Sequence, residues 1–276
     1  MLTTTVDGLW VLQVLTRLEV ISPELGLRPH IPSVESVHHA LMHPVALELL
    51  ESGVIDQAGV VDPAVVEWLT VLARRDVALL TMVSTPADAA PVRALLARFG
   101  QWWVSIERAD DLVRIAPAGV ASAEGDATAL IGQFLERICG AAKPAPLRPV
   151  TLDADLLTAG TADIAALRSL LLDQRIEADQ LRFLMLAADA GKSAAASIVA
   201  LQSGVEGARN RTYVEPGTVT VIDTPEGRIL TEQIPRGGKR WVVIGPGNPA
   251  NIATAVGAML RRLPAEESWF SYRKVV

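Results

Sequence analysis

The stretches LVRIAPAG (residues 112–119) and WVVIGPGN (residues 241–248) follow one pattern, a short β-rich run and then a proline–glycine break. Each precedes a run of alanine, leucine and isoleucine at helical spacing, over residues 127–139 and 252–263. A strand, a turn and an amphipathic helix that occur twice in one chain indicate two related halves that share one core. In both units we interpret the break as a turn.

The segments before the first unit predict helices and then an antiparallel meander. Short turns separate the later runs, as is typical of antiparallel strands, although the apolar run at residues 95–97 is also compatible with a helix. The continuous apolar run at residues 77–84 predicts a buried strand. The expected strands of this half are residues 2–6, 77–84, 92–99, 102–108 and 112–116, and the expected helices are residues 9–18, 33–50 and 62–75.

Residues 141–149 carry three prolines and no apolar period, which predicts a seam between halves 1–145 and 146–276. The second half repeats the order of the first: strand, helices, antiparallel strands, helix. Its expected helices are residues 164–172 and 179–188, and its expected strands are residues 195–202, 211–215, 218–223, 228–234, 239–244 and 269–275. We therefore expect one α+β domain with a shared antiparallel sheet and pseudo-twofold halves.

Composition excludes several classes of function. The formal charge is −6, half of the residues are hydrophobic and a fifth are charged, which argues against nucleic-acid binding and favours a surface that binds an apolar partner. The N-terminus lacks the basic region of a signal peptide, and no window reaches the length of a membrane span. The single cysteine, Cys139, forms no internal disulfide. We expect a cytoplasmic protein.

Two features raise the alternative of a small-molecule site, a metal site or an enzyme. The four histidines are clustered, and two of them have the i, i+4 spacing of a metal-binding helix face; they are His30, His38, His39 and His43. The turn at Gly245 lies between a strand and a helix, where phosphates bind. The histidines lack the other expected ligands, however, and the Gly245 turn lacks the residues of a phosphate loop. We interpret both as structural, with no catalytic residue, metal or cofactor.

Trp102 and Trp103 are adjacent on an expected strand, so their side chains point to opposite faces of the sheet. One of them belongs to the helix-covered core. The other is either covered elsewhere in the protein or exposed as a binding anchor on an open face, to which Arg98, Phe99 and Glu107 also contribute. The residues alone leave both interpretations open.

A set of motifs along the whole chain resembles the EspG family of mycobacterial ESX (type VII) secretion-associated proteins, most closely the subtype of the second ESX locus. The motifs are TTTVDGLW (3–10), PELGLRP (23–29), EWLTVL (67–72), GQWWV (100–104), PLRPVT (146–151), LLDQR (171–175), IDTPEGR (222–228), GPG (245–247) and LPAEESW (263–269). The resemblance implies a central antiparallel sheet with two helical bundles in a quasi-twofold fold. It also implies a cytosolic, non-enzymatic chaperone without cofactors, and it leaves both a monomer and a weak homodimer open.

The implied partner is the PPE subunit of a PE–PPE heterodimer, whose apolar tip is held for delivery to the secretion machine. The implied contacts lie in a loop (85–90), a sheet segment (98–107) and a helical bundle (163–189). The candidate partner-binding residues are Thr85, Pro86, Ala87, Asp88, Ala89, Arg98, Trp103, Ser105, Glu107, Gln180, Leu181 and Met185.

Overall fold

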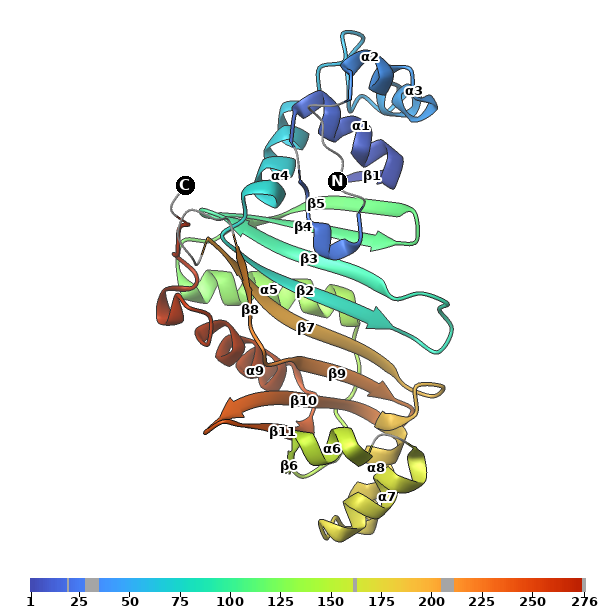
Figure 1. The fold of residues 1–276 in the computed structure, drawn as a ribbon, viewed down its shortest axis with the longest axis vertical. Coiled ribbons are helices and arrows are strands. Elements are labelled where there is room, and N and C mark those ends of the chain that lie inside the picture. The colour runs from blue at the N-terminus through green and yellow to red at the C-terminus, as the bar shows by residue number, and fades with distance from the viewer. Residues whose placement is uncertain (19, 28–34, 161–162, 205–210, 275–276) are drawn as a thin grey trace.

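A single large antiparallel sheet spans the molecule (Figure 1). The computed structural model describes residues 1–274 apart from 19, 28–34, 161–162 and 205–210, and the last two residues also lie outside the description. The strands of the first half are β1 (Leu2–Thr5), β2 (Val77–Ser84), β3 (Val92–Phe99), β4 (Trp102–Ala109) and β5 (Leu112–Val120). Those of the second half are β6 (Val150–Asp153), β7 (Ala194–Ser203), β8 (Thr212–Val214), β9 (Val219–Thr224), β10 (Gly227–Arg236) and β11 (Lys239–Pro246).

The strand order is symmetric about the centre of the sheet. It runs β1-β5-β4-β3-β2-β7-β9-β10-β11-β6, with β8 paired to β7 beside this path. Each half therefore contributes a short edge strand, a meander and a central strand. The centre is the antiparallel pair β2–β7, which is in register from Val77 opposite Gln202 to Ser84 opposite Ala195. This symmetry confirms the expected α+β class with quasi-twofold halves.

Helices cover the two faces of the sheet differently. On one face lie α5 (Glu124–Cys139) and α9 (Pro249–Arg261), whose apolar sides pack on the central strands. They run antiparallel, since Arg261 near the end of α9 contacts Glu124 at the start of α5 at 2.6 Å. On the other face, two bundles lie over the two ends of the sheet (Figure 1). They are α1 (Val6–Thr16), α2 (Val37–Leu41), α3 (Pro44–Glu51) and α4 (Pro63–Arg74), and then α6 (Ala154–Gly160), α7 (Ile164–Asp173) and α8 (Ala178–Ala188).

The expectation that the two proline–glycine breaks are turns was wrong, because each of them lies at the end of a strand. β5 continues through Pro117 and Gly119 to Val120, and β11 continues to Pro246. Proline fits here because each neighbouring edge strand is short: β1 pairs β5 only up to Ile115, and β6 pairs β11 only up to Ile244. Beyond those points the strand has a free edge, where a missing N–H costs little.

Two other expectations were wrong. The single helix predicted over residues 33–50 is two helices, because the Nδ1 of His43 caps the N-terminus of α3 and Pro44 cannot continue α2; residue 33 lies outside the described residues. The strand predicted over residues 269–275 is absent from residues 269–274. Trp269 is buried in the core instead, and the backbone carbonyls of Phe270 and Tyr272 accept hydrogen bonds from Arg98.

Candidate functional site

The sheet residues that the sequence suggested for partner binding point into the protein. Arg98, Trp103 and Ser105 are buried, and the last two face α5 because alternate residues of β4 share a face. Glu107 lies on the same face and forms an ion pair with Arg137 of α5. Contact with a partner through these side chains would require displacement of α5 or, for Arg98, of the C-terminal segment to which it is hydrogen-bonded, so we remove them from the candidate surface.

Trp103 is the core member of the tryptophan pair, with 1% of its surface exposed, whereas Trp102 is 53% exposed at the start of β4. We expect Trp103→Ala to lower the free energy of unfolding by about 3–5 kcal/mol, because it leaves a large cavity under α5. Urea unfolding of both single variants measures this. A Trp102→Ala variant as unstable as Trp103→Ala would contradict the assignment.

On the face opposite α5 and α9, none of the described helices covers the middle of the sheet, which lies between the two helical bundles (Figure 1). We call this the open sheet face. Met82 is 41% exposed there, and most of its neighbours are half-buried. Its side chains come from β2, β7 and β9, and they are Leu80, Met82, Ser84, Ala195, Ser197, Val199, Thr220 and Ile222. Such a half-buried apolar strip suits a partner that completes its burial.

The β2–β3 loop at residues 85–90 extends the open sheet face at one end. Pro86, Ala87 and Ala89 are exposed, and Asp88 is held by a hydrogen bond from the Thr85 hydroxyl at 2.7 Å. Because the loop leaves β2 directly after Ser84, it lies beside the start of β7, where Ala195 pairs with Ser84.

A groove of about 390 Å³ runs between α7 and α8. Met185 and Leu181 form part of its floor, and Ile164 is 57% exposed beside them. Gln180, which the sequence also suggested, is buried. In the orientation that pairs both its amide nitrogen and its amide oxygen, Gln180 donates to the Arg148 carbonyl and accepts a hydrogen bond from Arg148 Nε at 2.9 Å. Gln180 thus ties α8 to the seam and lies off the surface.

The loop, the open sheet face and the α7–α8 groove meet where β2 ends and β7 begins. Asp189 and Lys192 line the groove and lead into β7, which begins beside Ser84. Arg182 of α8 forms an ion pair at 2.6 Å with Glu226 in the β9–β10 turn, which fixes the helix against this end. The candidate surface is therefore continuous, although its parts are far apart in the sequence.

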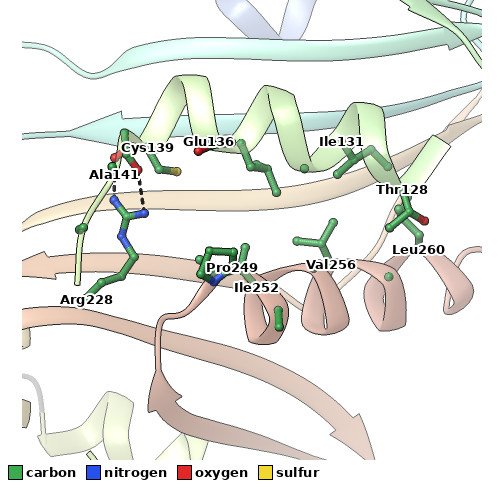
Figure 2. Close-up of a pocket in the computed structure, with 17 residues that line it drawn as sticks. Thr128, Ile131, Glu136, Cys139, Ala141, Arg228, Pro249, Ile252, Val256 and Leu260 are labelled. Carbon is green, nitrogen blue, oxygen red and sulfur yellow. Dashed lines mark hydrogen bonds between the residues drawn. The ribbon is translucent and has the colours of Figure 1, made fainter. Parts of the chain in front are cut away.

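A second cavity, of about 540 Å³, lies between α5 and α9 on the opposite face (Figure 2). Its walls are mostly apolar. At one end Arg228 donates to the carbonyls of Cys139 and Gly140 and forms a two-point ion pair with Asp223, which raises the pKa of Arg228. Burial raises the pKa of the Cys139 thiol. Arg228 therefore binds the protein itself, and the thiol is protonated at neutral pH.

The Gly245–Pro246–Gly247 stretch, at the junction of β11 and α9, serves the fold. Asn248 caps α9 by accepting a hydrogen bond from the Asn251 N–H at 2.8 Å, and Pro249 occupies the first turn. Gly247 is needed because a side chain there would collide with Arg228. A phosphate at this helix end would compete with the Asn248 side chain, so the structural interpretation holds.

The histidines do not converge on one site. His38 and His39 are exposed on α2, while His43 caps α3 and contacts the ring of Trp10 edge-on at 5.6 Å. His30 lies outside the described residues. The described part of the chain contains no group of three or more potential ligand side chains placed to hold a metal ion. Nor does it contain a helix long and apolar enough to cross a membrane.

Sequence reasoning missed the residues of the open sheet face. The run VALLTMVS of β2 is apolar almost throughout, so it predicts a strand buried on both faces, and nothing in it marks Met82 as exposed. The polar residues Ser197 and Thr220 in the neighbouring strands are the one available signal. They pair across β7 and β9 on the same face as Met82.

Comparisons with known proteins agree with this fold. The chain is 50% identical to the ESX-2 secretion-associated protein EspG2 of Mycobacterium tuberculosis over the full length of both chains. It is 30% identical to the ESX-3 secretion-associated protein EspG3 of Mycolicibacterium smegmatis, over 86% of this chain and 78% of that one.

A solved structure of the type VII secretion system chaperone EspG5 of Mycobacterium tuberculosis, in complex with a PE25–PPE41 dimer, superposes with a TM-score of 0.76. It is 24% identical and covers 99% of both chains. The family model described as EspG family matches residues 5–258. This chain therefore belongs to the EspG family, and its 50% identity to EspG2 over the full length fits the ESX-2 type.

Proposed function

We propose that this protein is a cytoplasmic, non-enzymatic chaperone that binds the PPE subunit of a PE–PPE heterodimer and keeps it competent for ESX secretion. The observation that carries the proposal is the continuous surface formed by the open sheet face, the 85–90 loop and the α7–α8 groove. A fold with a TM-score of 0.76 to a chaperone solved with a PE–PPE dimer supports it.

Binding would be driven by the burial of apolar surface on both this protein and its partner. A partner tip that lies on the open sheet face covers Met82 and its half-buried neighbours, and each Å² of apolar surface removed from water contributes about 25 cal/mol before the costs of association. Met185 in the groove adds a side chain that adapts to related partners. The partner's apolar tip is thereby shielded from aggregation.

Within this surface we retain part of the set of residues that the sequence suggested. The retained contacts are Thr85, Pro86, Ala87, Asp88, Ala89, Leu181 and Met185, to which we add Met82, Ser197 and Thr220. We also propose that residues 1–276 fold as one domain, since the β2–β7 pairing continues the sheet across the seam between the halves.

Co-expression with PE–PPE pairs tests the function. We expect a tagged form of the chain to co-purify with the PE–PPE pair of the second ESX locus as a stable ternary complex, with contact through the PPE subunit. A pair from a different ESX locus is the matched control and is expected to bind more weakly. Failure to capture any PE–PPE pair, with the chaperone folded, would refute the proposal.

A further inference from the structure

Two arginines lie directly opposite each other at the edge of the open sheet face. Arg93 of β3 pairs with Arg108 of β4, and Arg93 pairs on its other side with Met82. Side chains opposite each other in antiparallel strands have Cβ atoms about 4.5–5.5 Å apart, and two like charges in that position destabilise the sheet. An arrangement that costs stability in the free protein calls for a counter-charge.

The residues that the structure describes supply little of that counter-charge. Arg108 donates from Nε to the Asp110 carbonyl at 2.7 Å and from Nη1 to the carbonyls of Gly26 and Leu25 at 2.6 and 3.1 Å. These acceptors are neutral. Arg93 forms neither a hydrogen bond nor an ion pair with any residue that the structure describes. Its guanidinium is thus held near a second cation with its donors unused.

Both guanidiniums border one small cavity. A side chain at Gly26 would collide with Arg93 and would come within 3.2 Å of Arg108 Nη1, so both groups lie against the same point of the backbone. The cavity measures about 150 Å³, and its lining consists of Leu25, Ala90, Pro91, Arg93, Arg108 and Asp110. The Asp110 residue is exposed and makes no ion pair with either arginine, so it only partly offsets their charge.

We propose that Arg93 and Arg108 form a carboxylate-binding site, filled by an aspartate or glutamate side chain of the PPE subunit when it docks on the open sheet face. This inference rests on the proposed function. Ala90 and Pro91 connect the site to the 85–90 loop, and Met82 connects it to the open sheet face, so an acidic side chain beside an apolar tip reaches both. Two planar guanidiniums provide the forked donors that carboxylates bind best.

The site selects partners as well as binding them. A PPE tip that lacks the carboxylate would cover two guanidiniums without neutralising them, and removing uncompensated charge from water is unfavourable. Discrimination therefore comes from the penalty for the wrong partner as much as from attraction to the right one. The overall charge of −6 makes such a basic spot distinctive on this protein.

Calorimetric titration of the PE–PPE pair of the second ESX locus into the chaperone and its Arg93→Gln variant tests the proposal. Because Arg93 forms no hydrogen bond or ion pair with the described residues and lies opposite a second cation, the free variant should be as stable as the parent, or more stable. We expect the variant to bind the pair with an affinity about tenfold lower than that of the parent. Its binding should also depend less on salt. Arg236→Gln is the matched control: that residue is exposed at the tip of the β10–β11 hairpin, and its loss should change affinity less than about twofold.

An exchange of charges between Arg93 and the PPE tip identifies the acidic residue that occupies the site. Arg93→Glu should abolish binding, and lysine in place of one acidic residue at the PPE tip should restore it. If the parent captures the pair and Arg93→Gln binds equally well, this inference fails while the proposed function stands. If the parent captures no PE–PPE pair, both fail.

Discussion

A Met82→Glu variant is expected to bind the PE–PPE pair about a hundredfold more weakly while it remains folded. Met82 is 41% exposed at the centre of the open sheet face, so the free protein tolerates a charge there. Arg93 lies directly opposite and can pair with the new carboxylate. Docking would then bury an ion pair in place of an apolar contact, and the arginine would be unavailable to the partner.

Leu47→Glu is the control for this experiment. Leu47 is a more exposed apolar residue (60%) on α3, at the far end of the molecule from α7 and α8 (Figure 1), and its replacement should leave the affinity unchanged. Titration calorimetry gives the affinities, and thermal unfolding confirms that both variants are folded. Binding by Met82→Glu within threefold of the parent would show that the partner does not cover the open sheet face.

Arg98→Leu is expected to lower the free energy of unfolding by about 3–5 kcal/mol, because it leaves the Asp76 carboxylate without its buried cationic neighbour. Arg98 is 1% exposed and lies 3.9 Å from Asp76. It donates to the carbonyls of Gly100 and Phe270, at 2.8 and 2.7 Å, and to that of Tyr272, so it fastens the C-terminal segment to the sheet. Burial lowers the pKa of Arg98 to about 10, which still leaves it charged at neutral pH.

Urea unfolding measures the effect, with Arg114→Leu as the control. Arg114 is exposed on β5, so its loss should cost less than about 1 kcal/mol. The parent should unfold in one transition if the two halves form one domain. Limited proteolysis should also cut the C-terminal segment of Arg98→Leu first. Equal stability of the Arg98 and Arg114 variants would show that the buried arginine does not hold this segment.

The sequence predicted most elements of the fold because most are set by local signals. The helix expected from residue 62 begins where Asp62 caps α4, and the strands expected at residues 218–223 and 228–234 are β9 and β10, joined by a short turn. Where prediction failed, a neighbour in space decided the outcome. β5 and β11 continue through Pro117 and to Pro246, because the neighbouring edge strands β1 and β6 end before these prolines and need no N–H from them.

The candidate site was less accessible to sequence reasoning. Alternation along a strand places Trp102 and Trp103 on opposite faces of the sheet, but it does not say which face the helices cover. The family resemblance pointed to side chains on the face of β4 that α5 covers. The resemblance also placed Gln180 among the candidate partner contacts, yet it is buried against Arg148. Both outcomes depend on where α5 and the seam lie, which no local pattern encodes.

The sequence by itself determined the repeated strand-and-helix plan, the family and the net negative charge, since these follow from periodicity, motifs and composition. Only the tertiary structure decided which face of the sheet is open and that Arg93, Arg108 and Met82 stand side by side on it. The physical reason is register. Hydrogen bonding between strands far apart in the chain sets which side chains are neighbours, and the two helices α5 and α9 cover one face and leave the middle of the other for a partner.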